Sequence, residues 1–141
     1  MTKARHLWYN LSVMASEKKQ TILIVEDDEP IRQAIAVGLE RNGFEVVQAA
    51  DGEEGLKLAL EQKPDLVLLD LRMPKKTGQE MLDELREDEW GVEVPVIVLS
   101  NADDNLDIYL ATKDGRTSYA IKSSMELEEI IKLIKFRLGK K

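Results

Sequence analysis

The chain has 141 residues, a formal net charge of −7 at pH 7 and no cysteine. This length suits one domain that buries about two-thirds of its unfolded surface. The acidic balance argues against direct binding to nucleic acid or to anionic membranes. The absence of cysteine excludes disulfides, thiolate metal sites and a cysteine nucleophile. The absence of cysteine is compatible with a reducing cytoplasm, where we expect the protein. Because the apolar runs are far shorter than the ~20 residues of a membrane helix, we expect no membrane span.

The first 19 residues precede the periodic part of the chain. Their basic start and mildly apolar middle, interrupted by Asn10 and Ser12, do not suit a secretory signal. Residues 1–19 are therefore an expected extension, either disordered or packed as a short helical turn, and Met14 remains an alternative start. Residues 20–139 form the expected domain, with residues 140–141 as a tail.

Five short segments have the composition of β-strands. Residues 22–25, 66–69 and 96–99 are apolar throughout, which is typical of strands buried on both faces of a parallel sheet. Residues 44–47 and 118–121 mix apolar and polar side chains, which indicates edge strands. Helical patterns separate these segments, so the pattern predicts an α/β fold.

The helical patterns have recognisable ends. The first begins near Pro30 and stops at Asn42 and Gly43. Further helices are expected at about residues 53–62, 78–87 and 104–113. For the last helix, Ser123 followed by Glu126 forms a capping box, and an apolar stripe follows at Leu127, Ile130, Ile131, Ile134 and Leu138.

Two strand orders are compatible with five parallel strands, 3-2-1-4-5 and 2-1-3-4-5. The first would place the fully apolar third strand at an edge. The second places both mixed strands at the edges, and we therefore predict the doubly wound, flavodoxin-like (βα)5 arrangement with order 2-1-3-4-5. Ligands of such sheets bind at the carboxyl ends of the strands, where the first and third strands diverge.

Polar residues follow the predicted strands at that edge: Glu26, Asp27 and Asp28, then Asp70, Ser100 and Lys122. Carboxylates that converge in one crevice repel one another and are stabilised by a cation. Oxygen ligands without histidine or cysteine favour Mg²⁺. A carboxylate acceptor, a hydroxyl, a lysine and Mg²⁺ are the parts that phosphoryl transfer needs.

With these residues the chain resembles the receiver domain of two-component response regulators, over about residues 20–139. The segments that carry the resemblance are ILIVEDDEPIR, LVLLDLRMPKKTG, VIVLS and SYAIK. The resemblance implies that Asp70 accepts the phosphoryl group. It also implies that Asp27, Asp70 and the backbone carbonyl of Arg72 bind Mg²⁺, with Glu26 acting through a water molecule.

The same resemblance implies roles for three further residues. Ser100 and Lys122 would bind the phosphoryl group, and Tyr119 takes the position of the family's rotameric switch. The chain departs from the family pattern at Ser123, where a proline usually follows the lysine, so a cis peptide is not expected there. Asn101 is larger than the usual residue after the switch hydroxyl.

We therefore predict a signalling receiver, which catalyses only its own phosphorylation and dephosphorylation. Its donor would be a sensor histidine kinase or a histidine phosphotransfer protein. Only Gly139, Lys140 and Lys141 follow the last expected helix, which predicts a stand-alone receiver. Its downstream protein target would bind the face formed by the fourth helix, fifth strand and fifth helix, and a homodimer through the last helix stays open.

Three other functional classes share parts of this pattern. A pseudo-receiver, which binds a partner without phosphorylation, is the main one. A haloacid-dehalogenase-type phosphatase needs a second aspartate where this chain has Arg72. A flavin-binding carrier is disfavoured because the acidic loop EDDEP lacks the hydroxyls and glycines of a phosphate cradle.

Overall fold

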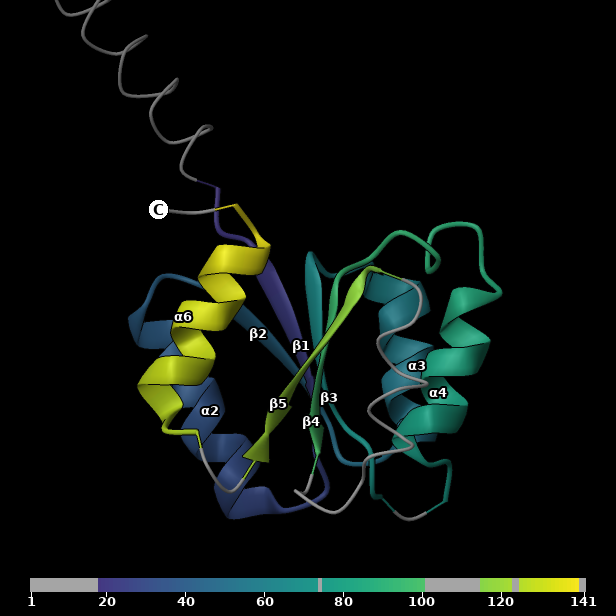
Figure 1. Ribbon diagram of the computed structural model, residues 1–141, viewed down its shortest axis with the longest axis horizontal. Helices are drawn as coiled ribbons and strands as arrows, with labels where there is room; N and C mark the ends of the chain where they lie inside the picture. Colours follow the sequence, from purple (N-terminus) through teal and green to yellow (C-terminus); the bar gives the residue numbers. More distant parts are fainter. Residues whose placement is uncertain (1–17, 74, 101–114, 123–124, 140–141) are drawn as a thin grey trace, which may run out of the picture.

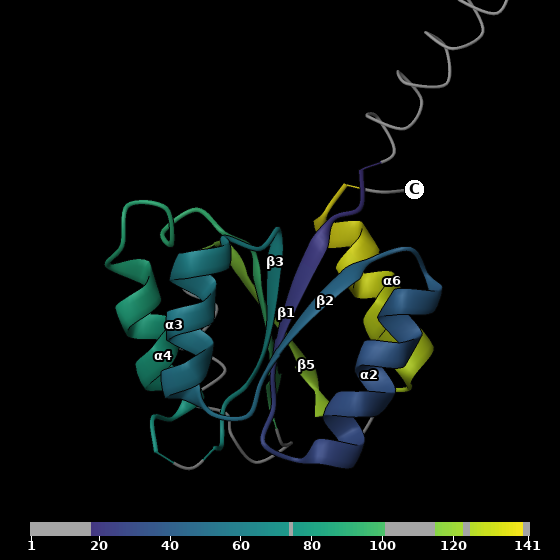
Figure 2. The same ribbon diagram turned by 180° about the vertical axis from the view of Figure 1, so that it is seen from behind.

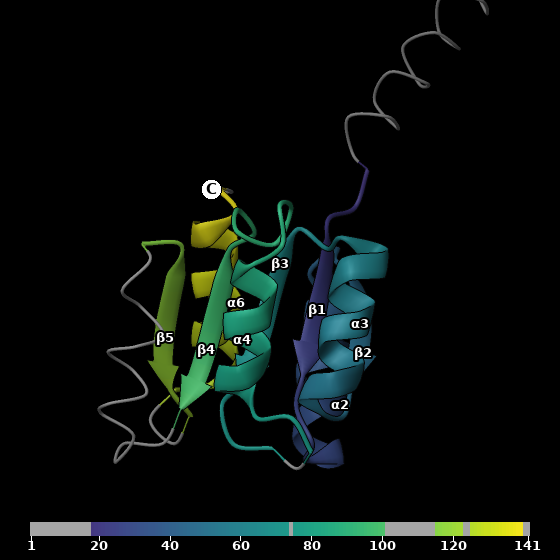
Figure 3. The ribbon, with the colours of Figure 1, turned by 90° about the vertical axis from the view of Figure 1, so that its right-hand side faces the viewer.

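The computed structural model describes residues 18–73, 75–100, 115–122 and 125–139 (Figure 1). Five parallel strands form one sheet, in the order β2-β1-β3-β4-β5. Their bounds are β1 Thr21–Val25, β2 Glu45–Ala49, β3 Leu66–Asp70, β4 Val96–Ser100 and β5 Thr117–Ile121. The predicted fold class and strand order are confirmed. Figure 3 shows the strands running in the same direction, so their carboxyl ends meet at one edge.

Four described helices cover the two faces of this sheet, namely α2 Glu29–Arg41, α3 Gly52–Gln62, α4 Gly78–Arg86 and α6 Leu127–Arg137. Helices α2 and α6 lie on one face, and α3 and α4 lie on the other (Figures 1 and 2). None of them is long and apolar enough to cross a membrane.

Alternate residues of the central strands point into two separate cores. Leu23, Val67 and Val98 pack toward α3 and α4, whereas Ile22, Leu68 and Ile97 pack toward α2 and α6. β1, β3 and β4 are apolar throughout because both of their faces are buried. The mixed strands β2 and β5 stand at the edges, as their polarity predicts.

The helix ends agree with the sequence signals in most places. Helix α2 has Pro30 in its first turn, is capped by Asp28, and ends at a cap on Asn42. Helix α4 begins with a capping box formed by Thr77 and Glu80.

The capping box predicted at Ser123 and Glu126 is wrong in its position. Helix α6 begins at Leu127 with Glu126 as its N-cap residue. The Glu129 side chain accepts a hydrogen bond from the Glu126 N–H, at 3.0 Å. That carboxylate satisfies an otherwise unpaired amide directly before the apolar stripe, so the helix begins three residues later than predicted.

Several predictions lie outside the described residues. They concern the extension before residue 18, the helix at residues 104–113, Asn101, the peptide bond to Ser123 and the tail at 140–141.

Candidate functional site

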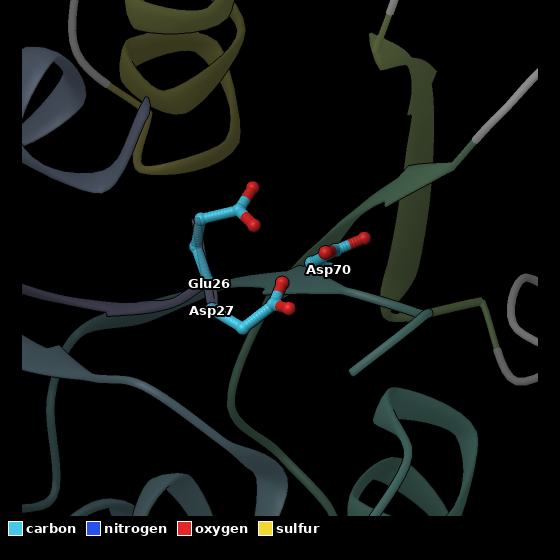
Figure 4. Close-up of side chains that lie close together, drawn as sticks. All are labelled: Glu26, Asp27 and Asp70. Carbon is cyan, nitrogen blue, oxygen red and sulfur yellow. The ribbon is translucent and has the colours of Figure 1, made fainter. Parts of the chain in front are cut away.

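Glu26 and Asp27 directly follow β1, and Asp70 is the last residue of β3. β1 and β3 are paired neighbours, with Val25 opposite Leu69, so the two strand ends lie side by side. One carboxylate oxygen from each of the three residues lies within 4.8 Å of the other two. Figure 4 shows the three side chains gathered at this edge.

The Asp70 carboxylate sits in a buried and crowded place. The residue is 6% exposed, its Oδ1 accepts a 3.4 Å hydrogen bond from the Arg72 N–H, and its Oδ2 lies 3.5 Å from Nζ of Lys122. Burial and the nearby Glu26 carboxylate raise the pKa of Asp70 to about 7, although Lys122 acts in the opposite direction. The protein's own groups therefore compensate the negative charge of this carboxylate only in part.

Lys122 follows β5 and reaches back to the same acidic group. Its Nζ lies 2.6 Å from Oε1 of Glu26, a residue that is 1% exposed. Burial lowers the pKa of Lys122, but Glu26 and Asp70 together more than offset this, so the net shift is upward. The lysine stays charged and neutralises only part of the negative charge.

Ser100, the last residue of β4, lies beside Ile121 of β5, the residue before Lys122. It is 2% exposed, and within the described part of the chain its Oγ has no hydrogen-bond partner. A buried hydroxyl without a partner is costly in a protein interior. Tyr119, by contrast, is 46% exposed on β5.

Three further residues lie at this edge: two are exposed, and the third caps a helix. Asp27 and Arg72 are exposed, and the Arg72 backbone N–H faces Asp70. Asp28 is not part of the acidic group, because its carboxylate caps α2 by accepting from the Ile31 N–H at 3.0 Å.

Gly78 brings α4 against the Asp70 strand end. Its N–H donates to the Leu71 carbonyl at 2.9 Å, and a Cβ at this position would lie 2.2 Å from the Asp70 carbonyl oxygen. Only glycine fits this approach without moving the backbone that carries Asp70.

Sequence reasoning missed two residues that support the site. Arg32 Nη1 donates to the Glu26 carbonyl at 2.9 Å, and Arg32 Nε donates to Gln48 Oε1 at 3.1 Å. The available signal was Gln48, a polar side chain within the otherwise apolar end of β2.

The donor set fits a hard divalent cation. All three side chains of the group offer carboxylate oxygens, which suit Mg²⁺ and not a soft metal. Three carboxylates beside one lysine leave the group net negative, and burial together with the Glu26 carboxylate raises the pKa of Asp70.

The fold and this site define a doubly wound α/β protein with three carboxylates gathered at the strand ends. Residues 22–135 match the response regulator receiver domain family, so the chain belongs to this family. Family members are signalling modules of two-component systems, and magnesium is the ion of their active site.

Two relatives illustrate the match. The transcriptional regulatory protein AfsQ1 of Streptomyces coelicolor is 37% identical over 102 residues, which cover 72% of this chain and 44% of AfsQ1. The phosphate regulon transcriptional regulatory protein PhoB of Pseudomonas aeruginosa is 35% identical over 122 residues, which cover 85% of this chain and 53% of PhoB. The chain thus spans about half the length of these relatives.

Solved receiver domains have the same architecture. The receiver domain of the Francisella response regulator 1452 superposes with a TM-score of 0.77 at 29% identity, covering 86% of this chain and 98% of that one. The receiver domain of the sensor histidine kinase PA1611 from Pseudomonas aeruginosa PAO1 gives a TM-score of 0.73 at 29% identity, covering 86% and 99%. That structure has a magnesium ion coordinated in its active site cleft.

Proposed function

We propose that Asp70 accepts a phosphoryl group from a phosphohistidine of a sensor kinase or a histidine phosphotransfer protein. The observation that carries this proposal is the buried Asp70 carboxylate, which lies at the carboxyl edge of the sheet with Glu26, Asp27 and Lys122 around it. In the transfer, an Asp70 carboxylate oxygen forms a bond to phosphorus, the bond from phosphorus to the histidine nitrogen breaks, and the imidazole leaves.

Asp27, Asp70 and the backbone carbonyl of Arg72 would hold Mg²⁺, with Glu26 acting through a water molecule. When bound, this ion supplies positive charge that neutralises phosphoryl oxygens during transfer. Glu26 and Asp27 are brought to Asp70 by the pairing of β1 with β3.

Ser100 and Lys122 would bind the transferred phosphoryl group. The Ser100 hydroxyl is buried, no described residue bonds to its Oγ, and it would donate a hydrogen bond to a phosphoryl oxygen. The Lys122 ammonium already lies 3.5 Å from Asp70 Oδ2 and would pair with the added charge.

The signal would then pass to a protein surface. Tyr119, exposed on β5, would turn inward as Ser100 moves, and the face that includes β5 and α6 would change its preferred conformation. A downstream protein would recognise this face, and a homodimer through α6 is a second use of it.

The length of the relatives bears on how the protein passes on its signal. A stand-alone receiver in the cytoplasm is the sequence-based proposal. The matched regulators AfsQ1 and PhoB, which are transcriptional regulatory proteins, are about twice as long as the matched segment.

The pseudo-receiver is the second candidate. Its support is the ion pair of Lys122 with Glu26, by which the protein neutralises part of the acidic group itself. In that case a partner would bind the unmodified domain.

Intact-mass analysis after incubation with acetyl phosphate separates the two functions. We expect one phosphoryl adduct that requires Mg²⁺, is absent from Asp70→Asn and is retained by Asp83→Asn, a variant of an exposed aspartate on α4. A folded wild-type protein that gains no adduct would overturn the phosphoacceptor proposal and favour the pseudo-receiver.

A further inference from the structure

The peptide bond between Glu26 and Asp27 joins two of the three clustered carboxylates. Both backbone groups of Glu26 are anchored. Its N–H donates to the Ala49 carbonyl at 3.0 Å, and its carbonyl accepts from Arg32 Nη1 at 2.9 Å. The Arg32 hydrogen bond therefore holds the Glu26–Asp27 peptide from α2, and the bond to Ala49 fixes the preceding Val25–Glu26 peptide against β2.

Arg32 is itself held in place. Its Nε donates to Gln48 Oε1 at 3.1 Å, and Gln48 directly precedes Ala49 at the end of β2. Both side chains are half-buried. The contacts thus close a ring that joins the end of β1, the first turns of α2 and the end of β2.

The two carboxylates beside this peptide are positioned differently. The Glu26 carboxylate contacts Lys122 and accepts a 3.1 Å hydrogen bond from the Asp28 N–H. Asp27 is exposed, and its carboxylate lies in the same group as those of Glu26 and Asp70. The direction of the Asp27 side chain toward Asp70, visible in Figure 4, depends on the backbone, and rotation of the Glu26–Asp27 peptide would turn it away.

We propose that Arg32, oriented by Gln48, is a positioning residue that fixes the Glu26–Asp27 peptide and so presets the carboxylates for a divalent cation. The planar guanidinium suits this role, because Nε and Nη1 point at two acceptors in a fixed geometry that a lysine ammonium does not reproduce. This inference rests on the proposed function, since it concerns the same cation site.

The test is Mg²⁺ affinity, measured by isothermal titration calorimetry on the full chain. Groups that orient metal ligands typically change affinity 10–100-fold when removed. We expect Arg32→Ala to raise the Mg²⁺ Kd about tenfold, with only partial rescue in Arg32→Lys. Gln48→Leu should raise the Kd several-fold, whereas Gln48→Glu, which keeps the acceptor, should stay near wild type.

Two further comparisons isolate the positioning role. If Gln48 acts only through Arg32, the double variant Arg32→Ala with Gln48→Leu will match Arg32→Ala alone. Gln33→Ala and Arg41→Ala, at exposed positions on the same helix, should keep the wild-type Kd. At saturating Mg²⁺, Arg32→Ala should be labelled by acetyl phosphate within about twofold of the wild-type rate, because the carboxylates themselves remain.

The outcomes separate this inference from the function on which it rests. If Arg32→Ala binds Mg²⁺ with the wild-type Kd, the inference is overturned. A lowered urea midpoint in that variant would then show that Arg32 has a structural role only. An unchanged Mg²⁺ Kd in Gln48→Leu would show that Gln48 does not orient Arg32 for this role. Wild-type protein that binds no Mg²⁺ would overturn the proposed cation site, and the inference with it.

Discussion

Lys122 forms its closer ion pair with Glu26, at 2.6 Å from Nζ to Oε1, and lies farther from Asp70, at 3.5 Å from Nζ to Oδ2. The resting counter-ion of the deeply buried Glu26 is thus a residue from the far end of the sheet, because β5 ends at the same edge as β1 and β3. The lysine that would bind a phosphoryl group is thus already engaged in an ion pair before phosphorylation.

We expect Lys122→Ala to lower the free energy of unfolding in EDTA by about 1–3 kcal/mol, because it leaves the Glu26 carboxylate buried without its counter-ion. Mg²⁺ should restore most of this loss by supplying positive charge at the same group. Urea denaturation with and without Mg²⁺ measures both effects. Lys132→Ala, at an exposed position on α6, is the matched control, and an equal loss under both conditions would contradict the explanation.

The same variant tests the conformational response. Lys122→Ala should still accept the phosphoryl group on Asp70, since the nucleophile and the proposed cation ligands remain. Its amide chemical shifts should change less on phosphorylation than those of wild type. Amide NMR spectra before and after acetyl phosphate treatment measure this, and changes as large as in wild type would argue against a role for Lys122 in the response.

Asp70 should make the stability of the protein depend on pH. Its folded-state pKa of about 7 lies above the unfolded value of 3.8, so between these values the folded protein binds more protons than the unfolded chain. The free energy of unfolding in EDTA should therefore fall as pH rises from about 4 to about 7, and then level off.

Asp70→Asn removes this dependence. At about pH 8 in EDTA we expect the variant to be more stable than wild type by about 1–2 kcal/mol, and the difference should vanish near pH 4. Chemical denaturation across this pH range measures the difference. A constant difference between the two proteins at all pH values would contradict the raised pKa of Asp70.

Ser100 and Thr117 make a contrasting pair of buried hydroxyls. Ser100 Oγ has no described partner, whereas Thr117 Oγ1 accepts a 2.8 Å hydrogen bond from Arg86 Nη2. Ser100→Ala should leave the free energy of unfolding within about 0.5 kcal/mol of wild type, and Thr117→Val should lower it by about 1–2 kcal/mol. Thermal or urea unfolding compares them, and an equal cost would mean that the Ser100 hydroxyl already has a partner.

Gly78→Ala should disturb the strand end that carries Asp70. The added Cβ would lie 2.2 Å from the Asp70 carbonyl oxygen and 2.6 Å from Leu71 Cα, which are backbone atoms that cannot rotate away. We expect a loss of about 2–3 kcal/mol and slower labelling by acetyl phosphate. Gly38→Ala is the control, because its Cβ would meet mainly the movable end of the Leu127 side chain at 3.0 Å, and its stability should change by less than about 1 kcal/mol.

Much of the fold could be predicted from the sequence, because the composition of each strand indicates how deeply it is buried. β1, β3 and β4 are apolar throughout since both faces are covered, and the mixed composition of β2 and β5 predicted their edge positions. The sequence predicted the starts of two elements less accurately. β2 runs from Glu45 to Ala49 and not from Phe44, because Phe44 lies before the strand and packs in the core with α2. The N-cap of α6 is Glu126 and not Ser123, because the Glu129 side chain accepts a hydrogen bond from the Glu126 N–H.

The sequence by itself determined that Glu26, Asp27, Asp70, Ser100 and Lys122 share one edge, because each follows or ends a strand and the strands are parallel. Only the tertiary structure decided which of them touch. It paired Lys122 with Glu26, left Ser100 Oγ without a described partner, assigned Asp28 to the α2 cap and joined Arg32 to Gln48. These contacts depend on the spacing of neighbouring strands and on the directions of side chains, which arise only when segments distant in the chain pack together.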